Sequence, residues 1–444
     1  MKTFNSKNKK CKLTEYKKYV CNQETGQGEL SVWTKALQTA IDENDYVYIP
    51  KGTYYLDESI ILSSNKWIKA DKKAEIILLE SCKKLMLRNA DVIDGSFTII
   101  PDTAPKTENI RIEGGIWSES NRCRIGYGRT GKYDDADSIH GVTCTMLFSG
   151  VKNLVLQNMV FKHSAGFSIQ MGRCENFTVK NIEFISCYAD GVHVNGGVRN
   201  GYVYNIHGEV GDDLVALNAY DWGKSTINNG EIENVVVEKV YAPTNVQCYK
   251  AIRIQPGILP IENGEMDCYV KNLCIKDVKG VSVFKMYLQT PRYVDKPDGV
   301  RVGWMENIRF ENVEVDAVEP IDAFPNYLTG DPIIGHFAAF ELGSNIRDIY
   351  FKNVNVSLNK EKYPLSHFVL VGPKSYYMEE EKTEIFDPYV VSKVGKIVCK
   401  NVKINNQKLQ DIQREICAIS FPDDMYKNQF GKGGSGTIGE IIVK

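Results

Sequence analysis

The sequence is poor in histidine and carries almost no net charge. Only 6 of its 444 residues are histidine, and 54 basic side chains are balanced by 56 acidic ones, for a formal net charge of −2. Nucleic acids and anionic membranes attract clustered positive charge, so this balance favours neither as a partner. No Gly-x-x-x-x-Gly-Lys-Ser/Thr motif occurs, and no metal cluster or nucleophile triad stands out. The composition is compatible with a ligand of carbohydrate size.

Export signals and long apolar runs are missing as well. Met1 to Gln23 is polar and rich in lysine, and no later stretch is apolar enough to span a bilayer. We therefore expect a cytoplasmic protein, or a secreted one if a leader has been removed. The 12 cysteines show no framework spacing, and Cys187, Cys274 and Cys399 lie inside apolar strand patterns. These features predict buried thiols rather than disulfides.

No Pro-, Gly- or Ser-rich linker divides the middle of the chain, and one short phrase recurs there. The phrase Asn-Leu-Val-Leu-Gln-Asn at Asn153 has counterparts at Asn176 and Asn200, in steps of 23 and 24 residues, and later steps are longer. Apolar and polar residues alternate within each phrase, which favours strands with one face in a core. The asparagine suits a turn whose side-chain amide bonds its equivalents in neighbouring coils. Further copies begin at Asn109, Asn234, Asn272, Asn307, Asp348 and, more faintly, Lys396.

This rhythm predicts an all-β protein, a single-stranded parallel β-helix in one domain over residues 1–444. Residues 1–46 are expected to form a tail and a cap with a short helix over Val32 to Asn44. Residues 47–358 would form the coils, and residues 359–444 an irregular cover with one last coil. The alternative is an antiparallel β-sandwich or a propeller, which the scarcity of Asn-Gly hairpin turns disfavours.

Three aspartates stand about one predicted coil apart. Asp190 comes just before one short apolar alternation, and Asp212 and Asp213 come just before the next, about 23 residues on. Residues one coil apart lie roughly 4.8 Å apart in space, so the three carboxylates would share one patch. One carboxyl group could then stay protonated while the others hold a water. Inverting glycoside hydrolysis uses such groups, with acid and base roughly 6.5–9.5 Å apart. The alternative is that both segments are ordinary turns.

The motifs around these aspartates resemble glycoside hydrolase family 28, the polygalacturonase family of the pectin-lyase-like superfamily. The family's Asn-Thr-Asp-Gly-Ile-Asp is matched by Tyr188 to His193, and its Gly-Asp-Asp-Cys-Ile-Ala-Ile by Gly211 to Leu217. Its Arg-Ile-Lys is matched by Arg253 to Gln255. The likeness runs loosely over residues 30–320 and implies a right-handed β-helix.

The resemblance assigns roles by position. Asp212 would be the general acid that protonates the leaving oxygen, and Asp190 and Asp213 would hold and activate the water. Arg253 would bond the sugar beside the cut, because its apolar neighbours should point inward and leave it facing the cleft. The alternative for Arg253 is a surface arginine that pairs with a neighbour.

The sequence also departs from the family. The family's Gly-His-Gly coil is missing, and His193 stands where another aspartate is usual. His193 could contact the sugar in its place, or could be a solvated residue of the coil. Gln255 replaces a cation that holds a galacturonate carboxylate, and Lys285 could restore that charge. Strand alternation predicts that Tyr287, Gln170 and Glu341 also bind substrate. Trp222 is expected to bind it by stacking on a sugar ring.

These observations predict an enzyme that hydrolyses O-glycosyl bonds with inversion, on pectin-type or galactose- or galacturonate-containing oligosaccharides. We expect exo action, because cells import oligosaccharides rather than polymers. We expect neither a cofactor nor a metal. Loops over residues 121–140 and 291–304 could block one end of the cleft. The expected partner is the oligosaccharide, and neither a nucleic acid nor a membrane is expected. The chain could also form a homo-oligomer. The alternatives are a polysaccharide lyase, often Ca²⁺-dependent, and a non-catalytic carbohydrate-binding β-helix of tailspike type.

Overall fold

Two compact units make up the chain in the computed structural model. The first comprises Met1–Asp212 with Lys224–Asn228, and the second Asp213–Gly223 with Asn229–Lys444. The sequence has no linker at this division. The described residues are 9–25, 28–80, 82, 85–92, 106–119, 144–221, 226–242, 250–280, 284–287, 303–318, 337–372, 391–418 and 435–444.

A short helix covers the first coil of the first unit, as predicted. Helix α1 (Thr34–Glu43) buries its apolar face, including Leu37 and Ile41, and packs on the 3₁₀ helix η1 (Leu13–Tyr19) and on strand β4 (Tyr46–Ile49). The segment expected as a polar tail also contributes, because strand β1 (Lys10–Lys12) pairs in parallel with β4. Strands β2 (Cys21–Thr25) and β3 (Gly28–Val32) form a hairpin beside it. No helix in the described residues is long and apolar enough to cross a membrane.

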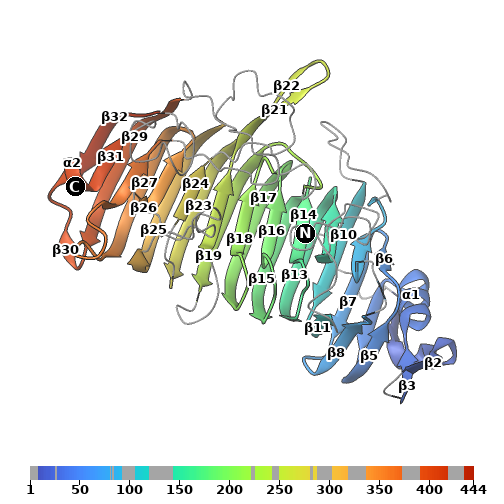
Figure 1. The fold of residues 1–444 in the computed structure, drawn as a ribbon. Helices are drawn as coiled ribbons and strands as arrows, with labels where there is room; N and C mark the ends of the chain where they lie inside the picture. Colours follow the sequence, from blue (N-terminus) through green and yellow to red (C-terminus); the bar gives the residue numbers. More distant parts are fainter. Residues whose placement is uncertain are drawn as a thin grey trace, which may run out of the picture. The chain divides into compact units, whose positions relative to one another are not determined.

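The coils of the first unit stack their strands in parallel (Figure 1). The sheet of short strands contains β6 (Ile60–Leu62), β9 (Leu87–Asn89), β12 (Cys144–Ser149), β14 (Phe167–Gly172) and β16 (Val192–Asn195). The other strands of the stack are β4, β5 (Gly52–Leu56), β7 (Lys66–Ala70), β8 (Ala74–Leu78), β10 (Thr107–Glu113), β11 (Ile116–Glu119), β13 (Val151–Lys162), β15 (Glu175–Ile185) and β17 (Val198–Gly208).

The second unit repeats this arrangement. Its short strands are β18 (Asp213–Asn218), β20 (Lys250–Gln255), β24 (Phe284–Tyr287), β26 (Phe337–Gly343), β28 (Ser366–Val371) and β31 (Ile416–Ala418). Its long strands are β19 (Ile232–Tyr241), β23 (Val270–Lys279), β25 (Trp304–Val318), β27 (Asn345–Leu358), β29 (Val391–Ile404) and β32 (Ser435–Val443). Smaller elements are the hairpin β21 (Gly257–Ile261) and β22 (Gly264–Cys268), β30 (Gln407–Lys408) and α2 (Ile412–Glu415).

These pairings define an all-β, right-handed parallel β-helix, as predicted. Stacked strands pair in parallel, which rules out the antiparallel sandwich or propeller. Within β15, Phe177, Val179, Ile182 and Phe184 are buried and the other residues are more exposed, in keeping with the predicted alternation. One expectation is corrected. Regular coils continue past residue 358, because β28 and β29 stack on β26 and β27, and β31 and β32 stack on them in turn.

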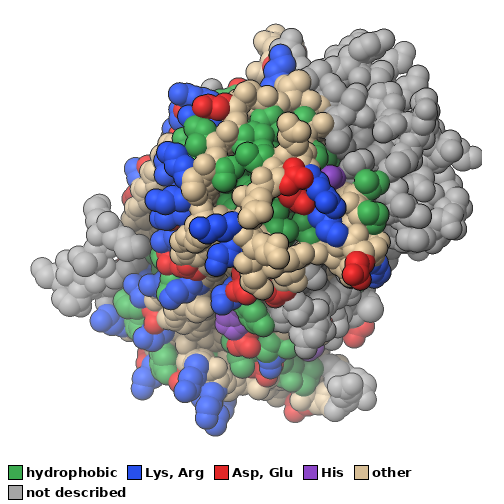
Figure 2. All heavy atoms as spheres, turned by 90° about the vertical axis from the view of Figure 1, so that its left-hand side faces the viewer, with side chains coloured by type: hydrophobic (Ala, Val, Ile, Leu, Met, Phe, Trp, Pro, Cys, Tyr) green, Lys and Arg blue, Asp and Glu red, His purple; other side chains and the backbone are tan. Residues whose placement is uncertain are grey.

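The last strand of the second unit keeps apolar side chains partly uncovered. Ile438, Ile441 and Ile442 of β32 are half-exposed, although one edge of β32 pairs with β29. Figure 2 shows this side of the molecule, with hydrophobic side chains in the middle of the face and Lys and Arg side chains along one border. Partial cover of this kind is expected for an edge strand, here one that pairs only with β29 among the described residues.

Asparagine ladders fix the turns between strands, as the recurring phrase predicted. In the first unit Asn176 Nδ2 donates to Asn153 Oδ1 at 3.2 Å, and Asn200 Nδ2 donates to Asn176 Oδ1 at 3.1 Å. The last residue of the phrase forms a second ladder, in which Asn181 Nδ2 donates to Asn158 Oδ1 at 2.8 Å. All these asparagines have φ between 55° and 62°, a left-handed conformation that asparagine tolerates better than most residues. The same bonds recur in the second unit, where Asn272 donates to Asn234.

Replacement of Asn176 should separate the two contributions of the ladder. Asn176→Ala is expected to lower the free energy of unfolding by about 2 kcal/mol. It removes two amide hydrogen bonds, and it places alanine, whose side chain forms no hydrogen bond with the local backbone, at a φ of 57°. Asn176→Gly should cost less, since glycine adopts positive φ freely. Urea unfolding followed by circular dichroism measures both. Equal losses for the two variants would contradict the conformational part of this account.

Candidate active site around three aspartates

The first part of the site is a buried Asp–His pair, in which His193 lies on strand β16 and Asp190 lies two residues before this strand. His193 Nδ1 lies 2.5 Å from Asp190 Oδ2, and both side chains are only 2% exposed. The imidazole stacks on the ring of Phe167, with 4.0 Å between centroids and 16° between planes. This packing orients the ring so that Nδ1 faces the carboxylate. The prediction that His193 is a solvated residue of the coil is therefore wrong.

An amide network sets the tautomer of His193. Asn195 Oδ1 accepts bonds from Gln170 Nε2 at 2.9 Å and from the Ile227 amide at 3.3 Å. Its Nδ2 is then the atom 3.2 Å from His193 Nε2, and it donates to that nitrogen. The Nδ1–H consequently donates to Asp190, as in other His–carboxylate pairs whose tautomer is set by the second nitrogen. His193 and its partners thus hold one oxygen of Asp190 in a fixed direction.

The second aspartate is brought beside the first by a glycine. A Cβ on Gly211 would lie 1.9 Å from the carbonyl oxygen of Tyr188, so only glycine lets the two backbones approach this closely. Tyr188 and Gly211 immediately precede the segments that carry Asp190 and Asp212. Carboxylate oxygens of Asp190, Asp212 and Asp213 lie within 4.8 Å of one another. Asp212 is half-exposed, whereas Asp190 and Asp213 are buried.

In the second unit, Asp213 is fully buried and faces an arginine of the next short strand. Arg253 Nη1 lies 3.6 Å from Asp213 Oδ2, and the arginine side chain is 14% exposed. Its neighbours Ile252 and Ile254 are buried, so the strand alternates as predicted. The arginine is not an ordinary surface residue, although it does pair with a neighbour.

The carboxylate oxygens lie as close as stacking of coils predicted, but closer than is typical of the acid and base in inverting enzymes. Nearest oxygens within 4.8 Å fall short of the roughly 6.5–9.5 Å typical of acid and base in inverting enzymes. Two hydrogen bonds of about 2.8 Å at a tetrahedral angle span about 4.5 Å, so one water could bond two of these oxygens. The spacing alone therefore does not support inversion, which depends on the resemblance instead.

Two other predicted residues are buried supports rather than exposed contacts. Gln170 pairs in register with His193 and bonds Asn195, and it has no exposed surface. Gln255 is also fully buried, and its Nε2 donates to the backbone carbonyl of Tyr220 at 3.0 Å. In this conformation neither amide reaches solvent. Both amides hold the strands of the site in this conformation, and their contact with substrate stays a prediction.

The remaining predicted residues are placed only in part. Lys285 is in register with Arg253 on one side and with Glu341 on the other, and Tyr287 ends the same strand β24. The side chains of Lys285 and Tyr287 lie outside the described part of the chain, as does all of Trp222. Glu341 is 6% exposed. The binding roles of these residues stay predictions.

Sequence reasoning missed Phe167 and Asn195, which fix His193. Asn195 could have been found, because it follows His193 by two residues and so shares its face of the strand. Phe167 could not, since its contact joins residues of different coils. A divalent cation could in principle use three carboxylate oxygens. Asp190 and Asp213, however, already face His193 and Arg253, so such an ion would compete with existing contacts.

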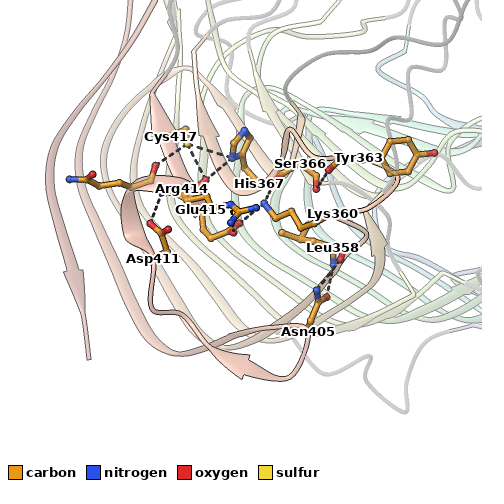
Figure 3. A network of polar contacts seen from close by, with 11 residues as sticks. Leu358, Lys360, Tyr363, Ser366, His367, Asn405, Asp411, Arg414, Glu415 and Cys417 are labelled. Atoms are coloured by element: carbon orange, nitrogen blue, oxygen red, sulfur yellow. Dashed lines mark hydrogen bonds and ion pairs between the residues drawn. The ribbon is translucent and has the colours of Figure 1, made fainter.

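A second cluster of reactive residue types lies at the C-terminal end of the second unit (Figure 3). Cys417 Sγ lies 3.5 Å from His367 Nδ1, but that nitrogen also donates to the Arg414 carbonyl at 2.7 Å and therefore carries a proton. Burial and nearby Glu415 raise the pKa of the Cys417 thiol. A protonated nitrogen cannot accept the thiol proton, so this pair is not an activated nucleophile. The cluster is a structural network, which also contains an ion pair of 3.0 Å between Lys360 and Glu415.

The buried thiols should be unreactive in the folded protein. Burial raises the pKa values of Cys174, Cys268 and Cys399 to about 12, so at pH 8 almost none of each thiol is ionised. Iodoacetamide should alkylate these cysteines roughly a thousandfold more slowly than an unperturbed thiol. Peptide mass spectrometry after timed labelling measures this, with exposed Cys21 as the internal control. All ten cysteines in the described residues are free. Rapid labelling of Cys174 in folded protein would contradict the buried placement.

The fold is a right-handed parallel β-helix, and the candidate site in it contains three acidic residues. No protein-family model matches the sequence, and no curated protein matches it. Solved structures do. The exopolygalacturonase of Thermotoga maritima superposes with a TM-score of 0.53 at 12% identity, over 98% of this chain and 91% of that chain. The family 28 exopolygalacturonase of Yersinia enterocolitica gives 0.50 at 13%, over 99% and 79%.

A fragment of gene product 12 of bacteriophage Phi29 is also similar, with a TM-score of 0.49 at 13% identity over 88% of this chain. This chain spans 64% of that fragment, less than two thirds of its length. Identities this low show a shared fold and no more. The activity must be argued from the site itself.

Proposed function

We propose that the protein hydrolyses O-glycosidic bonds in pectin-type oligosaccharides that contain galactose or galacturonate. The observation that carries the proposal is the approach of three carboxylates to within 4.8 Å, with one of them half-exposed. A half-exposed acid can reach a substrate oxygen, and two buried carboxylates can hold a water. Two of the similar solved structures are exopolygalacturonases, which supports a carbohydrate substrate by analogy of fold.

Each aspartate has a separate step in the proposed reaction. The Asp212 carboxyl group gives its proton to the bridging oxygen as the bond from that oxygen to the anomeric carbon breaks. Water attacks the same carbon, and its proton passes to the carboxylates of Asp190 and Asp213. The products are a sugar hemiacetal and an alcohol, and each turnover consumes one water. The proton gained by the base then returns to the acid through solvent.

The surroundings of the two bases suit this division of roles. His193 holds one oxygen of Asp190 in a fixed direction. Arg253, beside Asp213, keeps negative charge in place there and can donate to a sugar hydroxyl or carboxylate. We further propose exo action in the cytoplasm without a bound metal. We propose inversion because of the resemblance to the family. The carboxylate spacing is shorter than is typical of inverting enzymes, so the configuration of the product is the most informative part of the test.

The test is hydrolysis of a panel of aryl glycosides and pectic oligosaccharides, with the first product anomer identified by NMR. We expect release of a reducing sugar with inverted configuration, unchanged by EDTA. Retention would mean that one aspartate acts as a nucleophile. An unsaturated product that absorbs in the ultraviolet and depends on Ca²⁺ would indicate a lyase. Binding without turnover of any substrate would favour the non-catalytic alternative.

A further inference from the structure

Tyr269 and Trp304 form a stacked aromatic pair in the second unit. Their ring centroids lie 4.4 Å apart with 10° between the planes, and both side chains are half-exposed. Tyr269 directly precedes β23, and Trp304 is the first residue of β25 in the next coil. The pair therefore lies where connecting loops enter the long strands, and not on the face of a sheet.

The polar atoms of both rings are engaged by carboxylates. The Tyr269 hydroxyl donates to Glu233 Oε1, and the Trp304 indole N–H donates to Asp267 Oδ2. These bonds fix the orientation of the rings, and both side chains keep exposed surface. A rigid aromatic surface binds a ligand at a low cost in side-chain entropy.

Close backbone contacts connect this pair with the strands of the candidate active site. A Cβ on Gly303 would lie 2.2 Å from the Gly257 nitrogen, and one on Gly257 would lie 2.5 Å from the Tyr220 ring. Tyr220 follows β18, and Gly257 follows β20, which carries Arg253. Four residues separate Arg253 from Gly257, so fully extended backbone puts Trp304 within roughly 20 Å of Arg253. An oligosaccharide of several rings can cover that distance.

The charges around the pair select the kind of ring that can bind. Glu233 and Asp267 are both acidic and bond the pair. Asp267 belongs to the hairpin of β21 and β22, which is labelled in Figure 1. Negative charge disfavours a uronate or a phosphate at this position. The C–H face of a neutral sugar can pack on the electron-rich face of an aromatic ring, while its hydroxyls donate to carboxylates.

We propose that Tyr269 and Trp304 form a distal subsite that stacks a neutral sugar ring, of the galactose type, of an oligosaccharide whose other end occupies the aspartate site. This inference extends the proposed function and depends on it for the position of the scissile end. The enzyme would then prefer longer chains with an uncharged ring at this position over short ones or pure galacturonate chains.

Calorimetric titration can test the subsite without turnover, in Asp212→Asn protein. The probes are neutral galacto-oligosaccharides of two to six rings and galacturonate oligomers of the same lengths. Trp304→Ala should weaken binding of the longest neutral oligomers about tenfold and leave the disaccharide unchanged. Trp304→Phe should keep most of the affinity. Tyr202→Ala is the matched control, because Tyr202 stacks on Tyr204 on strand β17, with 5.6 Å between centroids.

Equal affinity of Trp304→Ala and its parent for every neutral oligomer would overturn the subsite, as would a failure of all neutral oligomers to bind. A larger loss for galacturonate oligomers would refute the neutral-ring assignment. Unchanged disaccharide binding shows that the variant is folded. If the wild-type chain hydrolyses nothing but still shows length-dependent binding through Trp304, the hydrolytic proposal fails and the subsite stands.

Discussion

Asp212→Asn is expected to lower kcat on oligosaccharides by 10²- to 10⁴-fold and to leave the fold and substrate binding intact. Asparagine has the shape of aspartate but no proton to transfer, and a positioned general acid typically contributes a factor of this size. Asp212 is half-exposed, so the change should cost little stability. Initial rates and melting temperatures measure both effects. Glu183→Gln, at an exposed position of β15, is the matched control and should keep full activity.

The leaving group provides a sharper form of this experiment. An aryl glycoside with an acidic phenol leaves without help from a general acid, so Asp212→Asn should lose little activity on it. Asp190→Asn removes a base instead, and its loss should be similar for good and poor leaving groups. Rates on a series of substituted phenyl glycosides compare the two variants. If both variants respond alike to the leaving group, the assignment of Asp212 as the acid is wrong.

The repeating backbone was largely predictable because its signals are local. Each Asn in the phrase marks a left-handed turn, and the intervening alternation marks the strand, so residues such as Asn153 and Asn176 located the coils. The helix over Thr34–Glu43 was equally clear from its apolar spacing. After residue 358 only one last coil was predicted, with a faint copy of the phrase at Lys396, because long insertions separate β28, β29 and β32 and the spacing that revealed earlier coils is lost there.

The interior of the site was harder to predict, because alternation describes only one face of a strand. Every residue of β16 is buried, and so is every residue of β18. His193 was assigned to the open face, yet the ring of Phe167 covers it, and Gln170 and Asn195 complete its surroundings. Such cover comes from residues of other coils. Which residues provide this cover depends on how the coils stack, and the residue spacing within one strand does not determine the stacking.

The second large effect should come from Arg253. Arg253→Met removes the guanidinium 3.6 Å from Asp213, a carboxylate with no exposed surface. Loss of one partner from a buried ion pair typically costs about 3–5 kcal/mol, because the other charge remains desolvated. We therefore expect a loss of about 3 kcal/mol in the free energy of unfolding, in addition to a large fall in kcat/KM. Chemical denaturation measures the first effect.

A double-mutant cycle shows whether the pair itself is responsible. Asp213→Asn added to Arg253→Met should recover much of the lost stability, because the buried negative charge is then absent. Activity should not return, since the amide that replaces the carboxylate cannot accept a proton from water. Arg309→Met is the matched control: Arg309 is exposed on β25 beside Tyr350 and should contribute less than about 1 kcal/mol. If Arg253→Met costs no more than Arg309→Met, the Asp213 carboxylate does not depend on this cation, and Arg253 is left with substrate binding alone.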